Sequence, residues 1–283
     1  MSRRLTTLKL FSWLLLFFCL ALGAAPGWTF HSPDMPKDLE RLRENGRLRV
    51  AILALNLPPF VFEENGKLVG ADVDMARDMA ANIGVEAVFV RIAGGYDDLV
   101  QAVAENRADV GICELSKTLK RAQSVFFSRP YMISGFTLLV NRLSSARARA
   151  ESGASDSNEF NFRDHLNSPD YTVSTMSKSA TVEIMKALFP AAQHRLTTDW
   201  SESAEAVYSG EVDAAIVADS DYQAIVHQMP ALRYKTAAQS LRIDDPLAIA
   251  VRPGLPDLLR WINDYLDVTA GQRAATPPGL VRR

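Results

Sequence analysis

Short apolar runs alternate along the chain with segments whose apolar residues recur at helical spacing. The short runs predict strands at residues 48–55, 87–92, 109–113, 136–140, 171–175, 213–218 and 247–251. The helical segments are 72–84, 97–106, 179–190 and 201–210, and typical helix-ending residues such as Gly84, Pro190 and Gly210 close three of them. Strands that alternate with helices predict an α/β fold with mostly parallel sheets.

Two stretches about a hundred residues apart repeat one pattern. They are AENRADVGICE at 104–114 and YSGEVDAAIVAD at 208–219. Each has a helix-ending residue (Asn106 or Gly210), then an Asp, then an apolar run closed by an acid (Glu114 or Asp219). Ligands of open α/β sheets bind outside the carboxyl ends of the strands, so two similar lobes sharing one cleft would explain the repeat. Helix–turn–strand units look alike in any α/β protein, so the repeat alone leaves that explanation open.

The first residues have the layout of a secretory signal peptide at 1–23. Arg3, Arg4 and Lys9 precede an apolar run at 10–22, and small residues follow it. The run is too short to cross a bilayer comfortably, and a retained membrane anchor is the alternative. Cys19 follows a Phe rather than a small residue, so no lipid attachment is expected. The sequence therefore predicts a periplasmic protein.

Composition supports a globular chain with a packed core. Of the 283 residues 48% are hydrophobic and 23% are charged, and the net charge of −2 argues against a nucleic-acid partner. Cys113 is the cysteine left after signal cleavage, so we expect a buried free thiol. Residues 144–158 have no apolar period and predict a flexible insertion, and residues 270–283 predict a disordered tail.

Two motifs resemble one family. LRVAILALNLPPFVFEENGKLVGADVDMARDMA contains Pro59-Phe60, Asn65-Gly66 and Gly70-Ala71-Asp72-Val73-Asp74, and SKTLKRAQSVFFSRPYM contains Ser116, Thr118, Arg121, Phe127, Ser128, Pro130 and Tyr131. These residues are similar to motifs of the family 3 periplasmic solute-binding proteins, which deliver polar amino acids to ABC importers. The resemblance implies a two-lobed, hinged α/β fold of the type II periplasmic-binding-protein kind. Lobe 1 would comprise 38–133 plus 245–268, and lobe 2 would comprise 137–237.

The resemblance also implies roles for individual residues. Arg121 would grip a ligand carboxylate with two parallel hydrogen bonds, and Ser116 would add a donor. Asp219 would take the ammonium group from the opposite lobe, and Tyr96 would form an aromatic wall. The alternatives are a surface charge for Arg121, a helix cap for Asp219, core packing for Tyr96 and a turn for Ser116.

Three positions depart from the family pattern. Lys178-Ser179-Ala180 stands where relatives often have Gly-Thr-Thr at a helix N-terminus, a place where backbone amides receive a carboxylate. Leu57 replaces an aromatic residue, and Glu114 replaces a small one. All three groups are candidate ligand contacts, and they leave the identity of the ligand open.

The expected function is a soluble, monomeric amino-acid receptor that works with a membrane permease and has no catalytic residue, metal or cofactor. The four His residues show no metal spacing, and no catalytic motif is present. Two alternatives remain. The first is a dehydratase-like enzyme on the same fold, with Glu114 as acid or base towards prephenate-like acids. The second is an accessory partner of an envelope enzyme or sensor, with an altered cleft.

Overall fold

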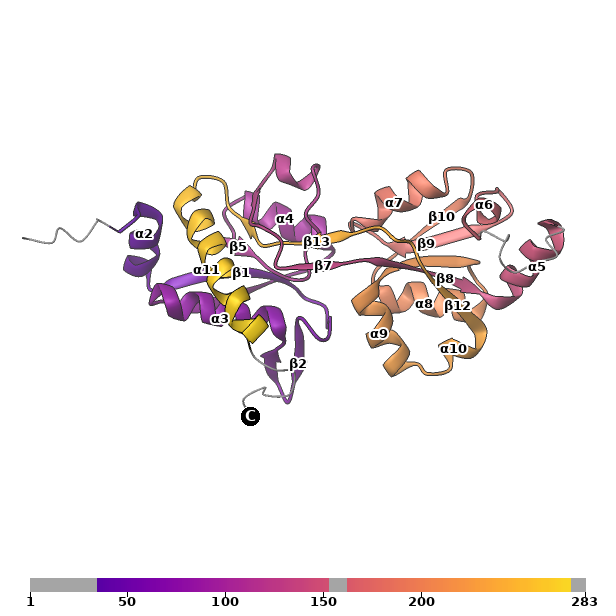
Figure 1. Cartoon of the computed structure of the whole chain (residues 1–283), viewed down its shortest axis with the longest axis horizontal. Coiled ribbons are helices and arrows are strands. Elements are labelled where there is room, and N and C mark those ends of the chain that lie inside the picture. Colours follow the sequence, from indigo (N-terminus) through magenta and orange to yellow (C-terminus); the bar gives the residue numbers. More distant parts are fainter. Residues whose placement is uncertain (1–34, 153–161, 276–283) are drawn as a thin grey trace, which may run out of the picture. The chain divides into compact units, whose positions relative to one another are not determined.

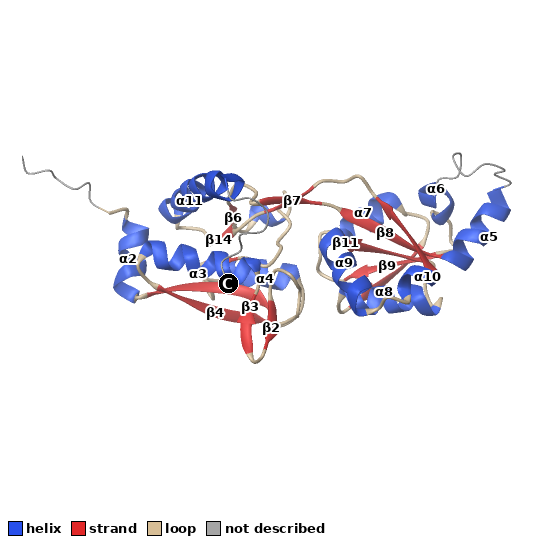
Figure 2. Cartoon of the chain, turned by 60° about the horizontal axis from the view of Figure 1, so that its bottom comes forward, coloured by secondary structure: helices blue, strands red, loops and turns tan. Residues whose placement is uncertain are grey.

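The computed structural model describes residues 35–152 and 162–275, and the expected signal peptide lies outside them. The described chain contains two five-stranded sheets, each flanked by helices (Figure 1, Figure 2). Within the described residues, no helix is both long enough and apolar enough to cross a membrane.

The first sheet has the strand order β4-β1-β5-β14-β6. Its strands are β1 (Arg47–Leu53), β4 (Glu86–Ile92), β5 (Val110–Gly111), β6 (Phe126–Phe127) and β14 (Ala250–Val251). The helices of this part are α2 (Lys37–Asn45), α3 (Ala71–Ile83), α4 (Tyr96–Ala104), the 3-10 turn η1 (Arg121–Gln123) and α11 (Pro256–Ala275). A separate hairpin joins β2 (Phe62–Glu64) to β3 (Lys67–Val69).

The second sheet has the order β10-β9-β11-β8-β12. Its strands are β8 (Phe136–Asn141), β9 (Thr172–Met176), β10 (Gln193–Thr197), β11 (Ala214–Ala218) and β12 (Thr236–Ser240). Its helices are α5 (Arg142–Ser152), α6 (Phe162–Leu166), α7 (Thr181–Leu188), α8 (Trp200–Ser209), α9 (Asp219–Gln228) and α10 (Leu232–Lys235). In each sheet the first three strands of the order pair in parallel, and the last two pairings are antiparallel.

The chain passes between the sheets along two paired strands (Figure 1). β7 (Met132–Ser134) pairs antiparallel with β13 (Asp245–Leu247). The elements on either side of β7, namely β6 and β8, belong to different sheets, and so do β12 and β14 on either side of β13. The division into two lobes with the boundaries given above stays a prediction.

The repeated sequence pattern forms the same structure twice. β5 and β11 each occupy the third place in their sheet. The turns before them use left-handed backbone at Asn106 (φ 63°) and Gly210 (φ 82°), a conformation that Asn and Gly tolerate better than other residues. Each helix therefore ends at a residue suited to reversing the chain into the central strand.

The Asp of each copy ties its strand to a neighbour. The Asp109 N–H donates to the Arg49 carbonyl at 2.9 Å, and the Arg49 N–H donates back to the Asp109 carboxylate at 3.0 Å. Asp213 exchanges the same two bonds with Thr172, at 3.0 and 2.8 Å. The two sheets thus have the same pair of hydrogen bonds between an Asp and the neighbouring strand, which we call the Asp109 and Asp213 locks, as well as the same pattern of strand pairing.

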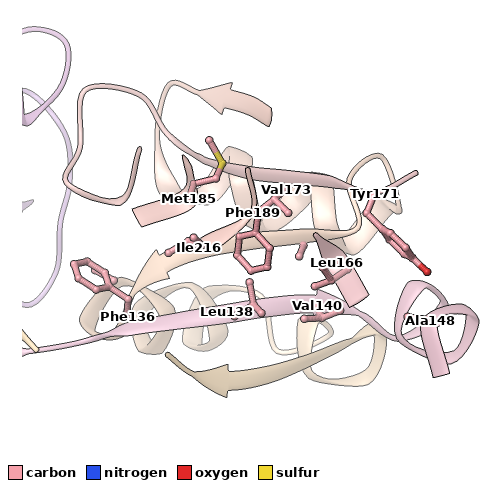
Figure 3. Close-up of a cluster of buried hydrophobic side chains, with 12 residues drawn as sticks. Phe136, Leu138, Val140, Ala148, Leu166, Tyr171, Val173, Met185, Phe189 and Ile216 are labelled. Atoms are coloured by element: carbon pink, nitrogen blue, oxygen red, sulfur yellow. The ribbon is translucent and has the colours of Figure 1, made fainter. Parts of the chain in front are cut away.

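A buried apolar cluster lies on the second sheet (Figure 3). Phe189, which follows α7, is fully buried there, and Leu138 and Val140 of β8 and Ile216 of β11 belong to the same cluster. The strand side chains come from the short apolar runs of the sequence and Phe189 comes from the predicted helical segment 179–190, so burial of their apolar surface holds the α7 layer to the sheet.

The structure differs from the sequence predictions in three ways. Half of the pairings in each sheet are antiparallel, because the strands after each crossing enter next to a central strand from the opposite direction. Residues 144–152 of the expected flexible insertion belong to α5, where Ala148 packs in the core, and 153–158 lie outside the described residues. α11 extends to Ala275 into the expected tail, and 276–283 are not described.

Replacing Phe189 by Ala should lower the free energy of unfolding by about 3–5 kcal/mol, because it leaves a large cavity in a dry core. Leu196→Ala is the control, since Leu196 is 53% exposed and should change stability by less than about 1 kcal/mol. Urea unfolding followed by circular dichroism measures both. Equal losses in the two variants would contradict the position assigned to Phe189.

Candidate ligand-binding site

A small cavity takes its walls from segments of both sheets. On the first-sheet side it is lined by Tyr96, Glu114 and Ser116, and Asp245 of β13 joins them. The second-sheet side contributes Phe136, Ser179, Ala180, Thr181, Trp200 and Ala218. Its volume is about 10 Å³, no more than the space that one water molecule requires. In this conformation the cavity has no room for an amino acid.

Arg121 lies beside this cavity at the start of η1 and is only 5% exposed. Its Nε and Nη2 atoms lie 2.9 Å from the same oxygen of Asp97, and its Nη1 donates to the Ser116 carbonyl at 3.0 Å. The guanidinium carbon is 5.8 Å from the centre of the Tyr96 ring. A buried cation is thus held in place at the wall, with a carboxylate of the protein as its partner in the closed form.

Ser116 and Asp245 connect the first sheet to the crossing strand. The Ser116 hydroxyl donates to the Asp245 carboxylate at 2.9 Å. Burial raises the pKa of Asp245 to about 6, although the Ser116 bond and Arg121 act in the opposite direction. The hydroxyl proposed as a ligand donor is therefore occupied within the protein when the cavity is closed.

Glu114 is the least satisfied charged group of the wall. It is 4% exposed, and its backbone has a positive φ of 49°. Its N–H donates to Asp72 at 2.6 Å, but neither carboxylate oxygen has a hydrogen-bond partner among the described residues. Burial raises the pKa of Glu114 well above its usual range, and repulsion from Asp221, Asp72 and Asp245 adds to this.

Asp72 lies next to Glu114 and is itself fully buried. One of its oxygens accepts from the Glu114 N–H and from the Tyr131 hydroxyl at 3.1 Å. Burial still raises the pKa of Asp72 to about 7, with both hydrogen bonds acting against that rise. Two acidic side chains are thus buried together on the first-sheet side.

Asp221 is a site residue that sequence reasoning missed. It lies in the first turn of α9, is 4% exposed, and has one oxygen without a partner in the described chain. Burial raises its pKa to about 7. It lines a second cavity of about 270 Å³, together with Leu57 and Trp200, and Trp200 also lines the small cavity. The one feature of the sequence that could have indicated Asp221 is its position two residues after the repeated pattern, which ends at Asp219.

Asp219, the predicted ammonium partner, is not among the residues that line the small cavity. It begins α9, and its carboxylate accepts from the Thr137 hydroxyl at 2.6 Å. A Cβ added at Gly135 would lie 2.6 Å from the other Asp219 oxygen, so this carboxylate packs against the crossing segment. Ala218, one residue earlier, lines the small cavity instead.

The start of α7 forms the opposite wall. Ser179 and Ala180 line the cavity just before the helix, and Thr181 is its first residue. The Ser179 hydroxyl lies 2.6 Å from the Thr181 hydroxyl and donates to the Met176 carbonyl at 2.6 Å. The first N–H groups of a helix have no intrahelical acceptor, so this wall suits a negatively charged group.

Lys178 joins the two sides rather than lining the cavity. Its backbone is left-handed (φ 54°), and its carbonyl accepts from the Asp97 N–H at 3.0 Å. Its ammonium group lies 2.8 and 2.9 Å from the two oxygens of Asp98. This set of contacts, the Lys178 clasp, links the turn before α7 to the start of α4.

The structure thus brings five of the predicted residues to the small cavity. They are Tyr96, Glu114, Ser116, Ser179 and Ala180. Arg121 and Lys178 contact its walls, Leu57 lines the larger cavity, and Asp219 lies near enough to the cavity-lining Asp245 to raise the pKa of that carboxyl. Sequence reasoning missed Phe136, Thr181, Trp200, Ala218, Asp221 and Asp245. Among the described side chains no group of three or more His, Cys, Asp or Glu is placed to hold a metal ion.

The chain belongs to the bacterial extracellular solute-binding proteins, family 3, whose model matches residues 48–272. This confirms the family predicted from the two motifs. The type II fold is confirmed by its similarity to solved amino-acid-binding proteins of that architecture.

Two curated relatives show how the family varies. The chain is 35% identical to the cyclohexadienyl dehydratase of Pseudomonas aeruginosa over 100 residues, 35% of this chain and 36% of that protein. It is 33% identical to the L-cystine-binding protein TcyJ of Escherichia coli over 105 residues, 37% of this chain and 38% of that protein. The matches therefore span little more than a third of either relative.

Among solved structures, a putative binding component of an ABC transporter from Wolinella succinogenes, complexed with lysine, is similar over most of its length. The TM-score is 0.67 at 26% identity, and the match covers 80% of this chain and 91% of that one. Binding proteins and an enzyme thus occur among the relatives.

Lys178→Ala should raise the ratio of open to closed molecules in the ligand-free protein by up to about fivefold. An ion pair as exposed as this one contributes roughly 0.2–1 kcal/mol. The Lys178 side chain is 55% exposed. Energy transfer between dyes at Leu119→Cys and Tyr234→Cys, two exposed positions on opposite sides of the clasp, measures the populations. Lys186→Ala, which removes a surface pair within α7, should change nothing. Equal effects of the two variants would show that the Lys178 clasp does not stabilise the closed form.

Proposed function

We propose that this protein is a periplasmic receptor that binds an amino acid in the cleft between two lobes and delivers it to an ABC importer. The observation that carries the proposal is the small cavity, whose walls come from both sheets and which closes without room for a solute. A site of that kind fits binding coupled to closure. The expected signal peptide at 1–23 supports the periplasmic location.

The two charged ends of an amino acid have complementary groups at the walls. Arg121 and the start of α7 suit the carboxylate, and the unpaired Glu114 carboxylate suits the ammonium group. Arg121 is already buried and oriented by Asp97. Its side chain therefore loses little conformational entropy when it binds the ligand carboxylate. Ser116 and Ser179 add hydroxyls on opposite walls.

Closure follows from contacts on both sides. A ligand held by Arg121 and Glu114 from the first-sheet side and by α7 from the other stabilises the closed form more than the open one. The β7–β13 pair, which contains the two crossings, is the natural hinge. The Lys178 clasp stabilises the same closed arrangement without ligand.

A second candidate function is supported by one observation, the buried Glu114 with its raised pKa, since such a carboxyl can act as a proton donor. One relative is a cyclohexadienyl dehydratase. Dehydration of a cyclohexadienyl compound by the wild-type protein, lost in Glu114→Gln, would favour the enzyme over the receptor.

Arg121→Ala should weaken binding of the cognate amino acid at least about 30-fold, because truncating one partner of a buried charge pair costs roughly 2–5 kcal/mol. Arg121→Lys should lose a smaller part, since a single ammonium cannot replace the guanidinium fork. Titration calorimetry against the common amino acids measures the affinities. Arg129→Ala, which removes an exposed pair with Asp267, is the matched control. Unchanged affinity in Arg121→Ala would remove the carboxylate site from the proposal.

Deletion of the gene in its own bacterium should abolish high-affinity uptake of the radiolabelled amino acid identified by calorimetry, because the importer would lose its receptor. Expression of the wild-type chain should restore uptake, and Arg121→Ala should not. Full uptake in the deletion strain would contradict the delivery of the amino acid to an importer, even if the protein binds it.

A further inference from the structure

Glu114 and Asp221 have carboxylate oxygens without a hydrogen-bond partner among the described residues. Glu114 has two such oxygens and Asp221 has one, and both residues are 4% exposed. One oxygen of Asp72 is also unpaired, but its other oxygen accepts two hydrogen bonds. Glu114 follows β5 of the first sheet, and Asp221 lies in α9 beside the second. Their charges repel each other, so they lie close enough to interact across the site.

The other charged groups at the site have partners. Arg121 is paired with Asp97, and Lys178 is paired with Asp98. Of the remaining acids, Asp245 accepts from Ser116, and Asp72 accepts from Tyr131 and the Glu114 N–H. No described cation is therefore left over for Glu114 and Asp221.

A buried carboxylate without a partner is strongly unfavourable unless it is protonated or receives a cation. Both acids belong to a site that has to open for a solute, so a solute can supply that cation. One ammonium group satisfies one of the two acids. A second positive charge on the same solute would satisfy the other.

The two cavities suggest a position for each positive charge of the solute. Glu114 lines the small cavity, where Ser116 and the start of α7 also lie. Asp221 lines the cavity of about 270 Å³, which is close to the size range of small-molecule pockets. Trp200 lines both cavities. A ligand with its backbone in the first and its side chain past Trp200 would occupy both.

We infer that this site selects an amino acid with a cationic side chain, with Glu114 receiving the α-ammonium group and Asp221 receiving the side-chain cation. The inference rests on the proposed function, in which Arg121 holds the carboxylate. Leu57 and the Trp200 ring would contact the apolar part of the side chain, because both line the larger cavity.

Three probes separate the inference from the proposed function. L-lysine carries all three charges, L-norleucine has a similar chain without the side-chain ammonium group, and cadaverine lacks the carboxylate. Calorimetry on the full mature protein should give lysine at least tenfold tighter than norleucine, and at least 100-fold tighter than cadaverine. Norleucine binding as tightly as lysine would overturn the inference alone. Cadaverine binding as tightly as lysine would overturn the carboxylate site of the proposed function.

Variants of Asp221 and Glu114 test which acid binds the side-chain cation and which binds the α-ammonium group. Asp221→Asn should bring the lysine-to-norleucine affinity ratio to within threefold of one while leaving norleucine affinity unchanged. Glu114→Gln should weaken both amino acids by a similar factor. Asp244→Asn is the control, because Asp244 is an exposed acid next to the β13 strand and should leave both affinities unchanged. An unchanged ratio in Asp221→Asn would overturn the assignment, and circular dichroism verifies that each variant is folded.

Lysine affinity should also depend on pH. Burial raises the pKa of Asp221 to about 7, so a fraction of this carboxyl is protonated in the closed form near neutral pH. A bound cation lowers that pKa and displaces the proton, so affinity should fall as the pH falls from 8 to 5. The carboxyls of Asp72 and Asp245, with pKa values raised by burial to about 7 and about 6, also titrate there, and Asp221→Asn should therefore reduce the slope without abolishing it. An identical slope in that variant would count against Asp221 as the cation's partner.

Discussion

Charged groups that are taken out of water need partners, and this requirement governs the site. Arg121 pairs with Asp97 within the first-sheet part, and Lys178 pairs with Asp98 across the two sides, so the protein neutralises its own buried or half-buried cations. This closed form leaves the Glu114 carboxylate without a partner among the described residues. The closed form is therefore well paired for positive charge and poorly paired for negative charge. A solute that carries positive charge inward corrects that imbalance, and this is why closure and binding belong together in the account.

The fold presents these groups by using one arrangement twice. β5 and β11 hold the same place in their sheets, and the Asp109 and Asp213 locks fix each to a neighbouring strand. The chain beyond each strand end then brings an acid to the site, Glu114 after β5 and Asp221 after β11. The repeated sequence pattern thus encodes two similar supports, and the acids that follow the strands are the groups to which the proposal assigns ligand binding.

Much of this was predictable from local sequence. Apolar runs located the main strands, and the motif around Arg121 placed a buried cation by the cavity. The sequence named Asp219 and not Asp221, because two residues differ by about 200° around a helix and the phase of α9 depends on packing. Asp245 was missed for another reason: its contact with Ser116 joins residues 129 positions apart, and no local pattern records such a pairing.

The most direct test of the central claim is a crystal structure of the mature protein grown with a saturating amino acid. The account predicts one molecule between the two sheets, with its carboxylate on Arg121 and its ammonium group within about 3 Å of a Glu114 oxygen. It also predicts that the cleft is closed around that molecule. An amino acid bound elsewhere, or a cleft that stays closed and empty at saturation, would contradict the account.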